Sequence, residues 1–271
     1  MELEGLRYIY STRPKKSLGQ YYLRDKGILQ KLLNSLNLTG SETVLEIGPG
    51  HGELTYYIAH RGKNVWAVEI DRNNIQILEE RLREFPNVHI IEENILNFQS
   101  DIFFDLIVGN IPYYLSGILL GSLSDRWRYK RVVLTLQKEV GERLSALPGT
   151  KSYGVLTLSV WYNHIIRILF DIPRNCFYPV PKVDSVVVEL NRIGDRDIEK
   201  SFFMRVVRAA FSNRRKMLPN VLVNLGLDRE YIVEILKEIG IDPHRRGETL
   251  SGEEFLSLGK RLYETFIFGK T

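Results

Sequence analysis

Four consecutive residues, Asn110-Ile111-Pro112-Tyr113, combine two hydrogen-bond acceptors, a rigid turn and an aromatic ring. The Asn110 side-chain oxygen and the Ile111 main-chain carbonyl could accept both N–H bonds of an adenine amine, and so localise the lone pair that the ring delocalises. Pro112 restricts the turn that directs this carbonyl, and Tyr113 offers a face on which a base can stack. The pattern favours methylation of an adenine amine, a displacement that depends on positioning rather than on a general base.

The place of this tetrapeptide in the chain supports the interpretation. Residues 105–109 form a short apolar run typical of a strand, so Asn110 should lie at the carboxyl end of that strand. Open α/β sheets bind their ligands at this end. An Asn-x-Pro sequence is also common in ordinary turns, and by itself it would be weak evidence.

A glycine-rich loop gives a second chemical signal. The apolar run at 44–47 leads into Gly48-Pro49-Gly50-His51-Gly52, and a helical pattern follows. Glycine at alternate positions allows unusual backbone angles and close approach to a ligand. The nicotinamide fingerprint would place its third glycine at Glu53. With Glu46 upstream, the loop instead resembles the cofactor loop of class I methyltransferases; a tight turn without a ligand is the alternative.

An acidic residue ends the next predicted strand, which spans 64–70 and finishes with Glu69-Ile70. A carboxylate at the tip of this strand can accept hydrogen bonds from both ribose hydroxyls of an adenosine cofactor. The loop and the carboxylate together predict a nucleoside-binding site beside the tetrapeptide. We interpret His51 as an incidental loop residue.

The elements that must position these residues alternate between strand and helix. Strands are predicted at 44–47, 64–70, 88–91, 105–109 and 131–137, and helices at 26–38, 53–60 and 73–85. This order predicts an α/β fold with a mostly parallel sheet. After an apolar stretch at 153–161, a strand at 183–190 should add an antiparallel edge. The polar segment 191–200 is typical of a linker, and only helical periodicity follows from Ser201 onward. We therefore expect a catalytic domain at 1–190 and a small all-helical domain at 191–271.

Composition limits the function classes. The chain has 271 residues and a net charge of +4, which permits a polyanionic partner without requiring one. Its single cysteine, Cys176, excludes an internal disulfide, and its five histidines show no metal-ligand spacing. We found no signal peptide and no apolar run of membrane-spanning length. We therefore expect a cytoplasmic protein with no bound metal and no membrane association.

Basic residues form three clusters. Residues 11–24 are predicted as an ordered arm, with Arg13, Lys15 and Lys16 as candidate RNA contacts. The acid-free segment 201–220 adds Arg205, Arg208, Arg214, Arg215 and Lys216. On a helix through this segment, Arg205, Arg208 and Arg215 would share one face, opposite Phe203, Val207, Ala210 and Phe211. Phosphate binding is the favoured interpretation here, whereas a merely solvated surface is equally plausible for the third cluster, at 126–131.

Six motifs in order resemble the small-subunit ribosomal RNA adenine dimethyltransferases, the kasugamycin-sensitivity group. They are the segments 14–23, 44–52, 110–113, 136–140, 177–185 and 211–216. The resemblance covers essentially the whole chain. It implies a Rossmann-like class I methyltransferase fold and S-adenosylmethionine as the cofactor. It also implies dimethylation of two adjacent adenosines in a hairpin loop near the 3′ end of 16S rRNA, with the immature small subunit as partner and the protein as a monomer.

The resemblance also implies roles for individual residues. Phe177 should sandwich the target base opposite Tyr113. The expected cofactor-binding residues are Gln20, Tyr21, Leu23, Gly48, Gly50, Glu69, Ile70, Glu93, Asn94 and Asn110. The family commonly has Asp at the place of Asn94, so Glu93 is a candidate substitute. The family's Arg-Ala-Glu becomes Arg246-Gly247-Glu248, a segment that we interpret as structural.

Two alternatives stay open at this level. A related group dimethylates 23S rRNA and confers macrolide resistance, although the segment 211–216 favours the small-subunit group. An RNA-binding assembly factor, in which methyl transfer is secondary, is the other alternative. The glycine loop and the tetrapeptide argue against an inactive enzyme.

Overall fold

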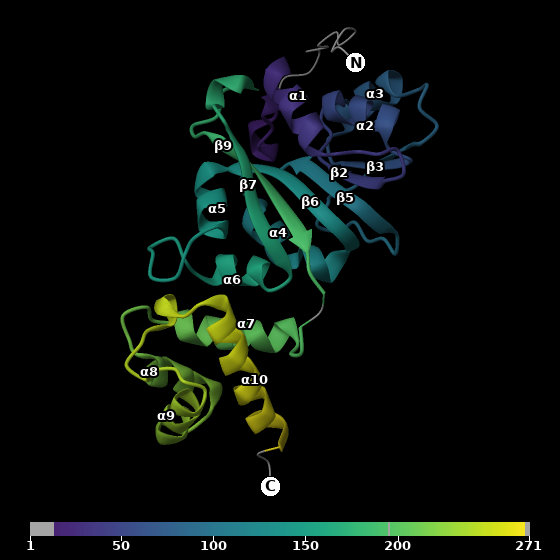
Figure 1. Ribbon diagram of the computed structural model, residues 1–271. Coiled ribbons are helices and arrows are strands. Elements are labelled where there is room, and N and C mark those ends of the chain that lie inside the picture. The colour runs from purple at the N-terminus through teal and green to yellow at the C-terminus, as the bar shows by residue number, and fades with distance from the viewer. Residues whose placement is uncertain (1–13, 195, 269–271) are drawn as a thin grey trace. The chain divides into compact units, whose positions relative to one another are not determined.

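The computed structural model describes residues 14–194 and 196–268 (Figure 1). These residues belong to two compact units. The first falls within Met1–Gly141 and Ile166–Arg192, and the second within Glu142–Ile165 and Ile193–Thr271. The chain therefore leaves the first unit at residue 142 and returns to it at residue 166.

A seven-stranded sheet organises the first unit, and its strands run in the order β4-β3-β2-β5-β6-β9-β7. The strands are β2 (Thr43–Ile47), β3 (Asn64–Glu69), β4 (Val88–Glu92), β5 (Phe103–Asn110), β6 (Arg128–Gln137), β7 (His164–Ile172) and β9 (Ser185–Arg192). The pairs from β4 to β6 are parallel, whereas β6 and β9 are antiparallel. The predicted mostly parallel sheet with an antiparallel edge is confirmed. The sequence did not predict β7.

Helices precede or connect most of the parallel strands, and those at 26–35, 53–61 and 72–81 match the sequence prediction (Figure 1). They are α1 (Lys26–Ser35), α2 (Glu53–Arg61), α3 (Arg72–Arg81) and α4 (Ser116–Arg126), and α5 (Lys138–Leu144) follows β6 directly. Asp25 begins α1 by accepting a hydrogen bond from the Ile28 N–H at 2.8 Å. The buried face of α1, Leu29 with Leu32 and Leu33, joins an apolar cluster with strand residues such as Val44.

A second, two-stranded sheet joins the N-terminal segment to a distant part of the first unit. β1 (Tyr22–Leu23) pairs antiparallel with β8 (Phe177–Tyr178), with Tyr22 opposite Tyr178 and Leu23 opposite Phe177. The Arg24 N–H extends this pairing by donating to the Cys176 carbonyl at 2.8 Å. Short 3₁₀ turns precede each strand, η1 (Lys16–Leu18) and η2 (Arg174–Cys176).

Helices make up the second unit. They are α6 (Val155–Trp161), α7 (Lys200–Phe211), α8 (Leu218–Leu222), α9 (Arg229–Glu238) and α10 (Gly252–Phe268), with short turns η3 (Val223–Leu225) and η4 (Gly247–Thr249). The side chains of Tyr153, Leu158 and Tyr162 are buried in one apolar cluster with those of α7 to α10. The ring centroids of Tyr162 and Phe203 lie 4.7 Å apart.

The second unit therefore includes residues 142–165, which the sequence-based division placed in the first domain. The apolar side chains of this segment pack against residues far along the chain. A local sequence pattern carries no information about such packing. The stretch 153–161 is mostly the helix α6.

The prediction of one helix through 201–220 is wrong. α7 ends at Phe211, the Ser212 hydroxyl donates back to the Ala209 carbonyl, and Asn213 Oδ1 accepts from the Arg215 N–H. Such side-chain to main-chain bonds compete with helix continuation. Arg205 and Arg208 are exposed on α7, opposite the buried Phe203, Val207 and Ala210, whereas Arg215 lies beyond the helix.

Within residues 14–194 and 196–268, no helix has the length and apolar character needed to cross a membrane. The same part of the chain contains no group of three or more histidine, cysteine, aspartate or glutamate side chains placed to hold a metal ion.

Candidate active site

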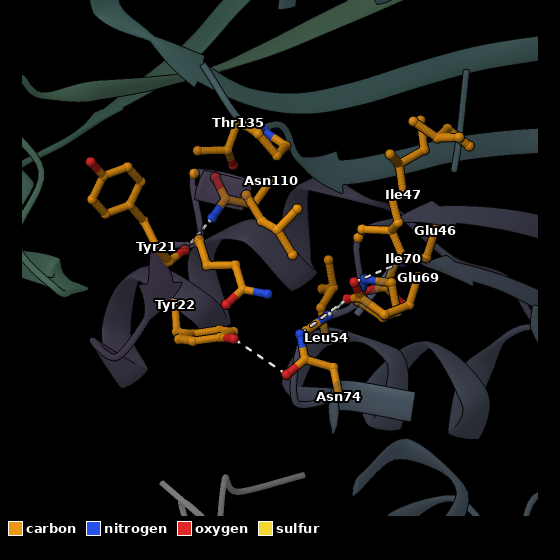
Figure 2. A pocket seen from close by; sticks show the side chains of 18 of the residues that line it. Tyr21, Tyr22, Glu46, Ile47, Leu54, Glu69, Ile70, Asn74, Asn110 and Thr135 are labelled. Atoms are coloured by element: carbon orange, nitrogen blue, oxygen red, sulfur yellow. Dashed lines mark hydrogen bonds between the residues drawn. The ribbon is translucent and has the colours of Figure 1, made fainter. Parts of the chain in front are cut away.

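A cavity opens in the first unit where the strands β2, β3 and β5 end, and Figure 2 shows some of the side chains that line it. About 1140 Å³ of atom-free space lies within its walls and open mouth, part of it continuous with bulk solvent. All the residues predicted to bind a cofactor line this cavity: Gln20, Tyr21, Leu23, Gly48, Gly50, Glu69, Ile70, Glu93, Asn94 and Asn110. The sequence patterns therefore converge on one place.

The glycine loop forms one wall of the cavity. Gly48 and Gly50 have φ angles of 64° and 61°, in the left-handed region that favours glycine. A Cβ added at Gly48 would meet no atom within 4 Å, so the backbone here borders open space. A Cβ at Gly50 would lie 2.9 Å from the Tyr22 ring. The loop thus combines a bare backbone facing the cavity with close packing against the N-terminal segment.

Glu69 ends β3 with a buried carboxylate that accepts several hydrogen bonds. Its Oε1 accepts from the main-chain N–H groups of Ile70 at 2.9 Å and Asp71 at 2.8 Å. Its Oε2 accepts from the Gly50 N–H at 3.1 Å and from Asn74 Nδ2 at 3.3 Å (Figure 2). Burial raises the pKa of Glu69 although these bonds oppose the shift. The four donors hold the carboxylate in a fixed orientation at the cavity wall.

Asn110 ends β5 with its amide oriented by a contact from the N-terminal segment. Its Nδ2 donates to the Tyr21 carbonyl at 2.6 Å (Figure 2). A carbonyl can only accept, so the contact places the amide nitrogen toward Tyr21 and leaves Oδ1 as the other end of the amide. Among the residues that the structure describes, Asn110 Oδ1 has no hydrogen-bond donor. An acceptor is therefore available beside the cavity.

The rest of the tetrapeptide has a mixed arrangement. Pro112 lines the cavity, whereas Ile111 is buried and its N–H donates to the Thr135 carbonyl at 3.1 Å. The Tyr113 ring stacks on the Tyr21 ring with centroids 5.3 Å apart, and its hydroxyl lies 3.4 Å from Ser185 Oγ. The neighbouring Tyr114 lines the cavity and is 57% exposed.

Phe177 lines the cavity from β8, but its side chain is only 3% exposed. It belongs to the apolar cluster that includes Leu29 and Ile172. The ring is therefore a wall of the cavity and part of the core at once. The adjacent Tyr178 is more accessible, and the Arg24 guanidinium lies 3.7 Å from the centroid of its ring.

Glu93 and Asn94 lie at the edge of the cavity after β4. Glu93 Oε1 accepts from the Asn94 N–H at 2.7 Å, and Asn94 Oδ1 accepts from the Leu96 N–H at 3.0 Å. The amide oxygen keeps a second lone pair, so it could accept one further hydrogen bond.

Comparison with known proteins places the chain in a family. The model of the ribosomal RNA adenine dimethylases matches residues 11–264. The chain belongs to this family. It is 38% identical to the ribosomal RNA small subunit methyltransferase A of Clostridium botulinum over 265 residues, which cover 94% of this chain and 96% of that protein. The resemblance found in the sequence motifs is confirmed, and the chain is a methyltransferase of the adenine dimethylase family.

Solved structures agree with the fold of this dimethylase. A dimethyladenosine transferase from Plasmodium falciparum matches with a TM-score of 0.81 and 27% identity, covering 92% of this chain and 98% of that one. The 23S rRNA methyltransferase ErmE matches with a TM-score of 0.71 and 25% identity, covering 89% and 99%.

Several residues in or next to this dimethylase's cavity were missed in the sequence. Tyr22 lines the cavity, and its hydroxyl donates to Asn74 Oδ1 at 3.3 Å. His51 is buried and stacks on Tyr22 with centroids 4.1 Å apart, so its interpretation as an incidental loop residue is wrong. No local signal connects residues 22, 51 and 74, because only the folded chain brings them together.

Glu46 is the other residue whose place the sequence did not reveal. It lines the cavity from β2, is 2% exposed, and its Oε2 has no hydrogen-bond partner within the described residues. Burial raises its pKa to about 8, with smaller contributions from the carboxylates of Glu53 and Glu69. Burial therefore favours the neutral form of this carboxyl group in the cavity wall.

The basic residues predicted to contact RNA differ in their availability. Lys15 pairs with Asp71, and Arg13 lies outside the described residues. Arg214 donates to Glu248 at 2.8 Å and to the carbonyls of Lys151 and Thr150, so its guanidinium holds the second unit together. This contact of Glu248 agrees with a structural role for the segment Arg246-Gly247-Glu248. The side chains of Lys16, Arg205, Arg208, Arg215 and Lys216 are exposed.

Proposed function

We propose that this dimethylase uses S-adenosylmethionine to convert two adjacent adenosines, in a hairpin loop near the 3′ end of 16S rRNA, to N6,N6-dimethyladenosine. The substrate would be the immature small ribosomal subunit in the cytoplasm, and the protein would act as a monomer. The observation that carries this proposal is the orientation of Asn110, whose side-chain oxygen is left as an acceptor beside a cavity walled by glycine backbone.

The open glycine backbone and the oxygen acceptors of the cavity support S-adenosylmethionine as its ligand. Open space at Gly48 allows a ligand to approach the backbone closely. Glu69 would hold the ribose, Asn94 with Glu93 would face the adenine, and Ile70 would provide an apolar surface. Of the four contacts to Glu69, the one from Asn74 is the longest at 3.3 Å, so we expect a ribose hydroxyl to replace it. The cofactor supplies an electrophilic methyl group on a sulfonium sulfur.

The tetrapeptide would activate the target amine. Asn110 Oδ1 and the Ile111 carbonyl each accept one N–H of the adenine amine, which localises the nitrogen lone pair for attack on the methyl carbon. The nitrogen would gain the methyl group as the methyl–sulfur bond breaks, which leaves S-adenosylhomocysteine, and one amine proton would leave to water. After the first transfer one N–H remains, so a single acceptor suffices for the second. Tyr113 and Phe177 would enclose the base, and the exposed Tyr114 is a further aromatic contact at the cavity.

Exposed basic side chains would bind the RNA backbone. Arg208, Arg215 and Lys216 are available on the second unit, and Lys16 on the first. Arg205 is exposed too, although its guanidinium lies 5.1 Å from the Phe266 ring centroid. We leave Arg214 out of the proposed RNA contacts because its Nε, Nη1 and Nη2 each donate a hydrogen bond within the second unit.

The test is nucleoside mass spectrometry of small-subunit particles treated with the protein and S-adenosylmethionine, followed by primer extension on 16S and 23S rRNA. We expect N6,N6-dimethyladenosine and two adjacent stops in 16S rRNA only. Methylation confined to 23S rRNA would instead assign the activity named for the ErmE structure. An Asn110→Ala variant that lost methylation yet supported normal subunit maturation in a deletion strain would identify binding as the main role.

A further inference from the structure

Asp71, two residues beyond Glu69, is a buried carboxylate that collects donors from the N-terminal arm, by which we mean residues 15–23. Its side chain is 3% exposed. Lys15 Nζ lies 2.7 Å from its Oδ1, and Gln20 Nε2 donates to its Oδ2 at 2.8 Å. The Asn73 N–H donates to Oδ1 at 3.0 Å, which begins α3. One carboxylate therefore joins the start of α3 to two points on the arm.

The two arm residues also bind each other. Gln20 Oε1 accepts from the Lys15 N–H at 2.7 Å, while Gln20 Nε2 faces Asp71. The turn η1 and the left-handed Gly19, with φ 62°, bring the two ends of this loop together. Lys15, Gln20 and Asp71 thus form a closed ring of contacts, which we call the arm latch.

The residues directly after the latch contact the chemical centre. The Tyr21 carbonyl accepts from Asn110 Nδ2, and the Tyr22 hydroxyl donates to Asn74, which in turn donates to Glu69. The arm also lines the cavity from Leu18 to Leu23. A shift of the arm would therefore move a cavity wall and remove the acceptor that orients the Asn110 amide.

The charges of Asp71 and Lys15 stabilise the contacts of the latch. Burial alone would raise the pKa of Asp71, but the hydrogen bonds from Lys15 and Gln20 lower it below its ordinary value. The carboxylate is therefore ionised at neutral pH. If Lys15 were removed, this buried charge would lose its counter-ion, which is costlier than losing an exposed pair.

We propose that Asp71 is a positioning residue, which through Lys15 and Gln20 fixes the N-terminal arm so that the cavity is closed on one side and the Asn110 oxygen faces the target amine. Lys15 would then stabilise the wall of the cofactor cavity instead of contacting RNA. The inference rests on the proposed function for its effect on catalysis, but not for the existence of the latch.

The test compares Lys15→Gln with Lys16→Gln, because the two variants remove the same charge from adjacent positions. Lys16 is exposed, and within the described residues its side chain has no ion-pair partner. Asp71→Asn removes the partner charge while keeping a side chain that begins helices well. Lys15→Arg is the conservative variant that should restore the pair.

The first measurement is hydrogen exchange of the peptide 17–25 without cofactor. We expect about tenfold faster exchange in Lys15→Gln and Asp71→Asn, no change in Lys16→Gln, and wild-type behaviour in Lys15→Arg. The double variant Lys15→Gln/Asp71→Asn should exchange no faster than either single one, because both remove the same contact. Equal exchange in Lys15→Gln and Lys16→Gln would overturn the latch.

The second measurement is calorimetric titration with S-adenosylmethionine, together with single-turnover methylation at saturating cofactor. We expect the Kd to rise about tenfold in Lys15→Gln and Asp71→Asn, as for the loss of one charged hydrogen bond. The rate at saturation should also fall, because Asn110 loses its orientation. A raised Kd with an unchanged saturated rate would overturn the link to Asn110. If the wild type did not bind the cofactor, the proposed function would be wrong. The hydrogen-exchange comparison would still show whether the arm latch exists.

Discussion

At the scale of single residues, two carboxyl groups on neighbouring strands, Glu46 and Glu69, are held in opposite ways. Glu69 accepts four hydrogen bonds, three of them from main-chain N–H groups, whereas Glu46 has an oxygen with no partner in the described part of the chain. A carboxylate held by N–H groups is prepared to bind hydroxyl groups. A desolvated carboxyl group instead keeps its proton. We therefore expect substitution of Glu69 to affect ligand binding and substitution of Glu46 to affect the pH dependence of stability.

Replacing Asn110 by Ala should lower the single-turnover methylation rate by about 10²–10³-fold, the usual cost of removing one transition-state hydrogen-bond partner. Asn97→Ala is the matched control, since Asn97 is exposed and lies outside the cavity lining. Rapid-quench assays of methyl incorporation would measure both. Equal rates in the two variants would remove Asn110 from the mechanism.

Glu69→Gln should weaken cofactor binding by about tenfold, because an amide oxygen accepts hydrogen bonds less strongly than a carboxylate. Calorimetric titration with S-adenosylhomocysteine gives the Kd without turnover. An unchanged Kd would contradict the ribose-binding role of Glu69.

Glu46→Gln should remove a pH dependence of stability. The pKa of Glu46 is raised from 4.5 to about 8, so the unfolded chain releases its proton at lower pH than the folded protein does. The free energy of unfolding should then fall as pH rises from 5 to 7, by about 1.4 kcal/mol per unit at most, and level off above 8. Urea unfolding of wild type and Glu46→Gln would show this difference. Glu84→Gln, at an exposed position, should keep the wild-type slope.

At the scale of elements, the glycine loop and the N-terminal arm are built against each other. Gly50 leaves room for the Tyr22 ring, which is enclosed further by His51 and is bonded to Asn74. Desolvation raises the pKa of the Tyr22 hydroxyl to about 12, so it remains a donor at any pH at which the enzyme would be assayed. The loop therefore positions the arm as well as the cofactor.

Gly50→Ala should weaken cofactor binding by about tenfold or more, because a Cβ there lies 2.9 Å from the Tyr22 ring. The control is Gly149→Ala, where φ is also positive, at 83°, but a Cβ meets nothing within 4 Å. Both variants should lose about 1 kcal/mol of stability from the backbone conformation. Only Gly50→Ala should change the cofactor Kd, and a similar change in both would show that backbone strain alone is responsible.

Sequence patterns predicted the order of the elements because apolar periodicity is local. The runs at 44–47, 64–70 and 105–109 became β2, β3 and β5, and their carboxyl ends brought the glycine loop, Glu69 and Asn110 to one cavity. What was missed depends on distant contacts.

Lys15 illustrates what a local pattern leaves out. It looked like an RNA contact because its neighbours are basic, and nothing near it in the sequence identifies Asp71 as its partner. The same reason applies to residues 142–165, whose buried tyrosines are matched to α7 and α10 only in the folded second unit.

At the scale of the whole molecule, some of the basic residues form ion pairs with acids and others are exposed. Arg214 and Lys15 are paired with acids, while Arg208, Arg215 and Lys216 are exposed on the second unit. The net charge of +4 is small, so RNA affinity should depend on these few side chains rather than on a general attraction.

Neutralising Arg208, Arg215 and Lys216 together should reduce the slope of log affinity against log salt by about 2–3, since each phosphate contact contributes roughly 0.7–0.9. The control neutralises Arg61, Lys63 and Arg83, three exposed basic residues of the first unit outside the predicted basic clusters. Filter binding to a 16S rRNA fragment at several salt concentrations would compare them. Identical slopes in the two triple variants would mean that net charge alone governs binding.

The pairing of β1 with β8 has a consequence for synthesis of the protein. The arm leaves the ribosome before the strand that completes its small sheet, Phe177–Tyr178, is translated. Until then the arm lacks the strand pairing that begins one residue after Tyr21. A nascent chain that already contains the glycine loop, Glu69 and Asn110 therefore lacks part of the pairing that holds the arm at the cavity. We expect the methyltransferase to become active only when nearly all of the first unit has emerged.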